Sequence, residues 1–173
     1  MFKFKSIIII FLPLLIFNVS NAQNIAYANL DQIIKSSSAG KDIVNFFNDK
    51  NKKLVDKIKN KEKEIQEKER SLVAQKNILE PEEFQKKINL LKDEIINFNK
   101  TNDTSLKNIK LEKEKVLNSF LLEINKILKE FAETNNIDII FSSSQMLIGK
   151  SNLDVTNDLL LIVNKKIKKI NFN

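Results

Sequence analysis

Two residue types that carry much of enzyme chemistry are missing from this sequence. Its 173 residues include no His and no Cys, and only two Gly and two Pro. The commonest general base, thiol nucleophiles and soft metal ligands are therefore absent, and two Gly are too few for a phosphate-binding loop. The Ser142–Ser144 run has no base beside it, and Asp138 alternates within an expected strand. We expect no enzymatic activity, no cofactor and no metal site.

Arginine is also scarce, and this limits the partners that the basic charge predicts. The formal net charge is +7, yet Arg70 is the only Arg among the 29 basic residues. Because bidentate phosphate recognition usually relies on Arg, the charge does not predict nucleic-acid binding. Lysines interspersed with Glu are more typical of a solvated helix face. Weak contact with acidic membrane lipids or acidic polypeptide segments stays open as the alternative.

The first 22 residues have the pattern of a secretory signal peptide. Lys3 and Lys5 precede an apolar run over residues 6–17, and the small residues 20–22 follow it. We expect cleavage after Ala22, which leaves about 151 residues outside the cytoplasm. An uncleaved membrane anchor is the alternative, but a run of about 12 residues is shorter than the ~20 that span a bilayer. The absence of Cys excludes a lipoprotein attachment site.

The chain is organised around residues 41–133, where the spacing of apolar residues is helical and heptad-like. Only Pro81 interrupts this stretch, and no Gly occurs in it. The apolar positions are Phe47, Leu54, Ile58, Ile65, Leu72, Leu79, Phe84, Ile88, Leu91, Ile95, Phe98, Ile109 and Val116. The pattern predicts two antiparallel helices, each on the order of 60–80 Å long, that fold back at a tip near residues 80–82. Pro81 suits the first position of the second helix.

Facing residues in an antiparallel helix pair have numbers that add to a constant, and a constant of about 163 aligns many of the apolar positions here. It pairs Leu79 with Phe84, Leu72 with Leu91, Ile65 with Phe98, Leu54 with Ile109, Phe47 with Val116, and Ile43 with Phe120. The same register leaves polar residues in the seam between the helices, including Lys68 opposite Ile95 and Lys61 opposite Asn102. So thin a seam buries little apolar surface, and we therefore expect flexible arms.

Residues 23–40 and 134–173 are expected to form a small body at the base of the arms. Short strands are predicted over residues 24–30, 137–141 and 146–149, and a last helix from Asp154 or Thr156 to about Lys168. Residues 36–40 are predicted to be a loop that leads into the first long helix, and Asn135 and Asn136 suit the end of the second. The expected fold is α+β and mostly helical, with a long coiled-coil hairpin projecting from a small β body. Three short strands leave open edges and cannot enclose a core, so oligomerisation through the body is the simplest remedy.

The order of these elements resembles that of the Skp (OmpH-like) periplasmic chaperone family. The matching segments are residues 25–30, 136–141 and 154–159, together with the signal peptide and the charged hairpin, over essentially the whole mature chain. The resemblance implies a jellyfish-like homotrimer in the periplasm, with three hairpins around a central cavity. It also implies an ATP-independent holdase that binds unfolded outer-membrane β-barrel proteins as clients and prevents their aggregation.

Two sets of candidate residues follow from this interpretation. The trimer body would use Ile25, Tyr27, Ile137, Ile139, Phe141 and Leu147. Apolar residues that the seam does not use would contact the client, namely Phe46, Val55, Val73, Ile78, Ile96 and Leu106. Such scattered groups would bind weakly and several at a time. For each of them, the alternative is a second side of the seam or an incidental exposed apolar group without a role in binding. For the whole protein, the alternative is an exported coiled-coil scaffold of the cell envelope.

Overall fold

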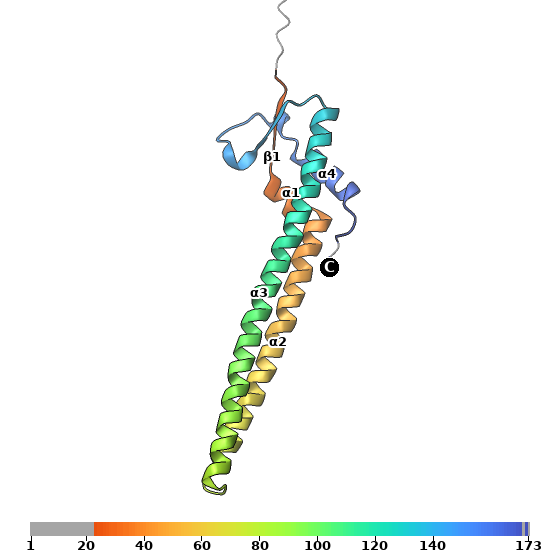
Figure 1. Cartoon of the computed structure of the whole chain (residues 1–173). Helices are drawn as coiled ribbons and strands as arrows, with labels where there is room; N and C mark the ends of the chain where they lie inside the picture. The colour runs from red at the N-terminus through yellow and green to blue at the C-terminus, as the bar shows by residue number, and fades with distance from the viewer. Residues whose placement is uncertain (1–22, 171, 173) are drawn as a thin grey trace, which may run out of the picture.

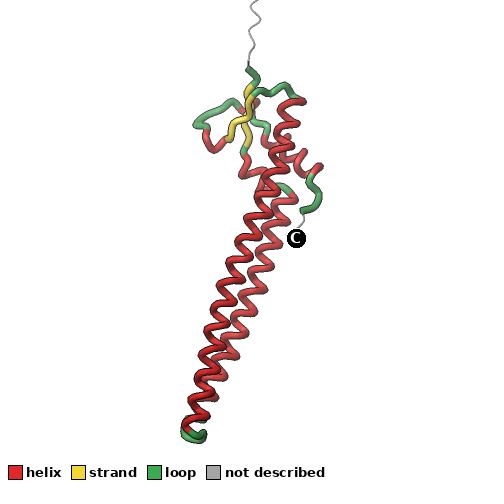
Figure 2. Tube along the Cα trace, in the orientation of Figure 1, coloured by secondary structure: helices red, strands yellow, loops and turns green. Residues whose placement is uncertain are grey.

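The computed structural model describes residues 23–170 and 172, so the predicted signal peptide lies outside the described residues. Two long helices form an arm, and the short elements gather at one end of it (Figure 1). The element order is β1 (Ile25–Ala28), α1 (Leu30–Ser36), α2 (Ser38–Ala74), α3 (Pro81–Thr134), β2 (Ile139–Ser142), the 3₁₀ turns η1 (Ser143–Gln145) and η2 (Ser151–Leu153), and α4 (Thr156–Lys166). The predicted fold class is confirmed: most of the chain is helical, and a long hairpin projects from a small body (Figure 2).

α2 and α3 lie side by side as antiparallel partners (Figure 1). α2 has 37 residues and α3 has 54, which correspond to about 55 and 80 Å of helix. As predicted, Pro81 opens α3, and two acidic residues follow in its first turn. The turn is longer than predicted, because α2 already ends at Ala74 and residues 75–80 connect the helices. Glu80 has an extended ψ of 142°, as expected for the residue before a proline.

Polar contacts between α2 and α3 show the register of the two helices. Side chains pair Lys50 with Glu112, Lys68 with Glu94, and Gln75 with Lys87. The residue numbers of each pair add to 162, within one residue of the predicted constant. Between Leu54 and the tip, Ile65 and Ile109 are the buried apolar residues, and the other apolar seam positions are half-buried. The predicted thin seam is confirmed.

A denser core forms where the arm meets the body. There α3 buries four apolar side chains at helical spacing, Val116, Phe120, Ile124 and Ile127. They belong to one cluster with Ile33 of α1, Ile43 and Phe47 of α2, and Leu159 and Val163 of α4. The arm is therefore anchored at its base, while its distal part is held by the thin seam and by polar contacts between the two helices.

α1 and α2 are separated only by Ser37, where the sequence predicted a loop over residues 36–40. That prediction is wrong, because Ser37 caps α2: its buried Oγ accepts a hydrogen bond from the Gly40 N–H at 3.1 Å. The same Oγ donates to the Ile34 carbonyl at 3.3 Å. The two helices pass so closely that a Cβ on Gly40 would lie 1.6 Å from the Ile34 carbonyl oxygen. Glycine is required at this position by the close approach.

β1 and β2 form a two-stranded parallel sheet, paired along all four residues of each strand. The predicted third strand over residues 146–149 is wrong, because this segment is irregular and lies between η1 and η2. The outer edge of β1 is instead taken by the chain just before α4. Tyr27 forms a bridge with Asp154, and its carbonyl accepts a hydrogen bond from the Val155 N–H at 3.0 Å. The β1 edge that a third strand would need is thus occupied.

The ends of α3 and α4 follow the sequence prediction closely. α3 stops at the predicted asparagine pair, where Asn136 has a left-handed φ of 51°. Before α4, the Asp154 carboxylate accepts a hydrogen bond from the Thr156 N–H at 2.9 Å. The Thr156 hydroxyl in turn accepts one from the Asn29 N–H at 2.8 Å, which ties α4 to the junction between β1 and α1. α4 ends at Lys166, two residues before the predicted end.

Candidate functional site

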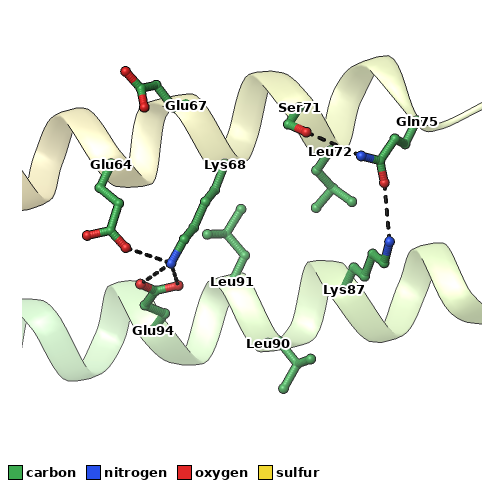
Figure 3. Close-up of a pocket in the computed structure, with 10 residues that line it drawn as sticks. All are labelled: Glu64, Glu67, Lys68, Ser71, Leu72, Gln75, Lys87, Leu90, Leu91 and Glu94. Carbon is green, nitrogen blue, oxygen red and sulfur yellow. Dashed lines mark hydrogen bonds and ion pairs between the residues drawn. The ribbon is translucent and has the colours of Figure 1, made fainter.

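The distal arm combines one apolar layer with polar contacts on both sides of it (Figure 3). Leu72 and Leu91 lie between a Lys68–Glu94 ion pair, with an Nζ–Oε1 distance of 2.8 Å, and a hydrogen bond from Lys87 Nζ to the Gln75 side chain at 3.2 Å. These side chains also line an open groove along the seam. Polar residues thus fill alternate layers of the seam, so the distal parts of α2 and α3 are held together weakly.

An ion-pair network on this part of the arm shifts the pKa of its members. Lys61 and Lys68 each lie 2.8 Å from carboxylate oxygens of both Glu64 and Glu94. Hydrogen bonds from Lys61, and then from Lys68, lower the pKa of Glu64 to about 2. The same donors lower the pKa of Glu94, and the two carboxylates raise the pKa of both lysines. The network joins the two helices beside Ile65, one of the two buried apolar residues between Leu54 and the tip.

The six candidate client-contact residues do not form one patch. Five of them are exposed and spread along the arms: Val55, Val73, Ile78, Ile96 and Leu106. Val73 and Ile78 lie at the tip, with 71% and 80% of their surface accessible. Phe46 differs from the others, because it is half-buried at the root of the arm, where α2 leaves the body. The arms thus offer separated apolar contacts on a charged surface rather than a continuous apolar groove.

Four of the six candidate body residues are brought together by the sheet. The pairing sets Ile25 beside Ile139 and Tyr27 beside Phe141, so these four side chains form one face, which we call the outer sheet face. Ile25, Ile139 and Phe141 are exposed to about 40%. The opposite face is buried at Ala26 and Ala28. Of the two remaining candidates, Ile137 precedes β2 and is half-buried, and Leu147 is fully exposed.

The loop between η1 and η2 packs against the outer sheet face. A Cβ on Gly149 would lie 2.7 Å from the Tyr27 ring and 2.9 Å from the Met146 side chain. The loop backbone therefore lies against the tyrosine ring, and a Cβ at this position would require the Tyr27 and Met146 side chains to shift. Leu147 and Ile148, in the same loop, are exposed to solvent. Together with the outer sheet face, they give the body an apolar surface that a single chain does not cover.

A cluster of three phenylalanine rings at the root of the arm was missed by the sequence analysis. The rings of Phe46 and Phe172 stack with centroids 4.2 Å apart and planes inclined by 12°. Phe47 meets Phe46 edge-on at 5.1 Å, and Lys50 Nζ lies 5.6 Å from the Phe46 centroid. The only sequence signal for this contact is a few apolar residues spaced by two or three after the last helix.

Among residues 23–170 and 172, no three His, Cys, Asp or Glu side chains gather where they could hold a metal ion. None of the described helices has a stretch of the length and hydropathy needed to cross a membrane.

The comparisons with known proteins place these features in a family. A family profile described as outer membrane protein (OmpH-like) matches residues 24–161. No curated protein matches the chain significantly. The crystal structure of a candidate outer membrane chaperone (OmpH-like) from Caulobacter crescentus is similar, with a TM-score of 0.83 and 12% identity over 88% of this chain and 90% of that one. At this identity the similarity concerns the fold.

The family match begins at β1, covers α2 and α3, and reaches into α4. It therefore includes the sheet, the hairpin and most of the core rather than the coiled coil alone. From this extent, the chain belongs to the OmpH-like family of outer membrane proteins.

Proposed function

We propose that this protein is an ATP-independent holdase chaperone of the periplasm that binds unfolded outer-membrane β-barrel proteins and prevents their aggregation. The observation that carries the proposal is the contrast between an anchored base and weakly joined distal arms with exposed apolar side chains. Single contacts of this kind are weak, but several used together hold an extended polypeptide. Arms with a thin seam can also adapt to clients of different size.

A homotrimer is the second part of the proposal. The outer sheet face and the nearby Leu147 expose apolar side chains, and β2 pairs only with β1 among the described residues. A neighbouring chain on this edge would satisfy its backbone groups and cover the apolar surface. Three chains joined in this way would hold three arms around a cavity in which the client is bound. Lysines on the solvated faces would add a weak, salt-sensitive attraction to acidic membrane lipids.

Light-scattering mass tests both parts together. We expect the mature protein to have the mass of three chains. It should gain one client, and keep it soluble, when a urea-unfolded outer-membrane barrel is diluted into it. A trimer that ignores the client would point to the scaffold of the cell envelope instead. A monomer or an open-ended polymer would contradict the assembly.

A set of arm variants tests where the client binds. Replacing Val55, Ile96 and Leu106 together with Ser should weaken client binding about tenfold, since three exposed apolar contacts are lost. Leu161→Ser is the matched control, because Leu161 is 69% exposed but lies on α4, outside the arms. Equal client affinity of the triple variant and the control would place the contacts elsewhere.

A further inference from the structure

The chain does not end with α4 but continues across the root of the arm. α4 ends at Lys166, and the last backbone hydrogen bond of the described tail joins the Ile167 N–H to the Val163 carbonyl at 2.8 Å. Beyond it, Ile170 and Phe172 contact the core through their side chains. Figure 1 shows this tail turning from α4 towards the start of α2. The tail is thus held mainly by side-chain packing.

The surface under the tail is specific in its chemistry. Phe46 presents its ring face to Phe172, Phe47 closes one side edge-on, and Lys50 places its ammonium group near the Phe46 ring. Flat apolar faces with a neighbouring cation favour an aromatic partner over an aliphatic one. Lys50 also forms an ion pair with Glu112 of α3, so this surface adjoins a polar contact between α2 and α3.

Phe46 is the one client-contact candidate that the chain itself covers. The other five are exposed, whereas Phe46 is half-buried with Phe172 stacked on it. The covering group is an aromatic side chain carried by a segment without helix or strand structure. An aromatic residue in an unfolded polypeptide has the same chemistry and the same freedom of approach.

We propose that Phe46, Phe47 and Lys50 form a binding site for aromatic side chains of unfolded polypeptides, and that Phe172 occupies this site until a client displaces it. The proposal rests on the proposed chaperone function and adds a defined contact to it. The tail would make the site available only to segments that compete with Phe172, which lowers the apparent affinity for clients with few aromatic residues.

A tryptophan reporter tests the displacement directly, because the sequence contains no Trp. In the Phe172→Trp variant of the full chain, emission should be blue-shifted while the indole is docked on Phe46. Titration with a Trp-free unfolded polypeptide rich in Phe and Tyr should shift the emission to the red. The same polypeptide with its Phe and Tyr replaced by Leu should cause no shift. Adding Phe46→Ala to the reporter should give red-shifted emission before any client is present.

The affinity of variants provides the second readout. Phe172→Ala should bind the aromatic client about fivefold more tightly than the parent, because the competing side chain is gone. Phe46→Ala should weaken that binding, and Lys169→Ala, elsewhere in the tail, should leave it unchanged. Client light scattering is recorded in the same titration. If the client stays soluble while the reporter indole stays docked, or if Phe172→Ala binds less tightly, the displacement proposal is overturned. If the client aggregates regardless, the chaperone function itself fails, and this proposal with it.

Discussion

Gly40, at the junction between α1 and α2, has no room for a side chain. Its missing Cβ leaves room for the Ile34 carbonyl, and its N–H is bonded to the buried Ser37 hydroxyl. We predict that Gly40→Ala lowers the free energy of unfolding by about 3 kcal/mol, the upper range for overpacked sites. Urea unfolding followed by circular dichroism measures this. Asp42→Ala, on the exposed side of the same helix turn, should change stability little.

The lowered pKa of Glu64 predicts how the stability of the hairpin depends on pH. Its pKa is lowered from 4.5 to about 2 by Lys61 and Lys68, so the network stabilises the folded arms fully above about pH 4.5. That contribution is lost as the pH falls through about 2. Carbon NMR of the Glu64 carboxyl should show a midpoint near 2, and Lys61→Gln should raise it towards 4.5. An unchanged midpoint in Lys61→Gln would contradict the assigned cause.

The contact between α2 and α3 is weak near the middle of the hairpin. Asn102 and Ser105 are half-buried polar residues of α3, and Ser105 lines a groove together with Lys57 of α2. The Thr101, Thr104 and Ser105 hydroxyls each donate to the carbonyl four residues earlier, which tends to bend a helix. The seam is therefore interrupted at the level where α3 itself has a tendency to bend.

An apolar side chain in place of Asn102 should strengthen the contact between α2 and α3. We predict that Asn102→Ile slows amide hydrogen exchange about tenfold across residues 98–108, because a polar layer becomes apolar. Asn99→Ile, on the exposed side of α3, is the matched control and should leave exchange unchanged. Equal exchange rates in both variants would mean that the polar residue at position 102 does not limit the separation of α2 from α3.

The success of prediction also differs between elements, for a physical reason. The hairpin depends on periodicity within one segment, so Pro81 and the seam positions were found to within a residue or so. The third strand was predicted from an apolar run, but the edge of β1 at Tyr27 is occupied by a segment from farther along the chain. The Phe46–Phe172 stack joins residues 126 apart and has no local pattern. In both places the contact that was missed is set by tertiary packing, whereas the Ser37 cap that replaces the predicted loop is a local feature.

For the whole molecule, the proposed trimer depends on the outer sheet face as the interface between chains. We predict that Ile139→Lys with Phe141→Lys reduces the light-scattering mass to one third, because two charges would be placed in the proposed interface between chains. The helical circular dichroism signal should remain, since α2 and α3 pack on each other within one chain. Leu161→Lys on α4 is the control and should keep the larger mass. A double variant that stays trimeric would exclude this face from the assembly.

The pairing of β1 with β2 has a further consequence for how the protein is made. The strands are 114 residues apart, so β1 cannot find its partner until nearly the entire chain is available. The hairpin needs only nearby residues and can form earlier, since local contacts close faster than distant ones. If the chain crosses a membrane with its N-terminus first, β1 emerges long before β2 and stays unpaired until β2 follows. The last stretch of the chain thus sets the time at which the body, and any assembly through it, is completed.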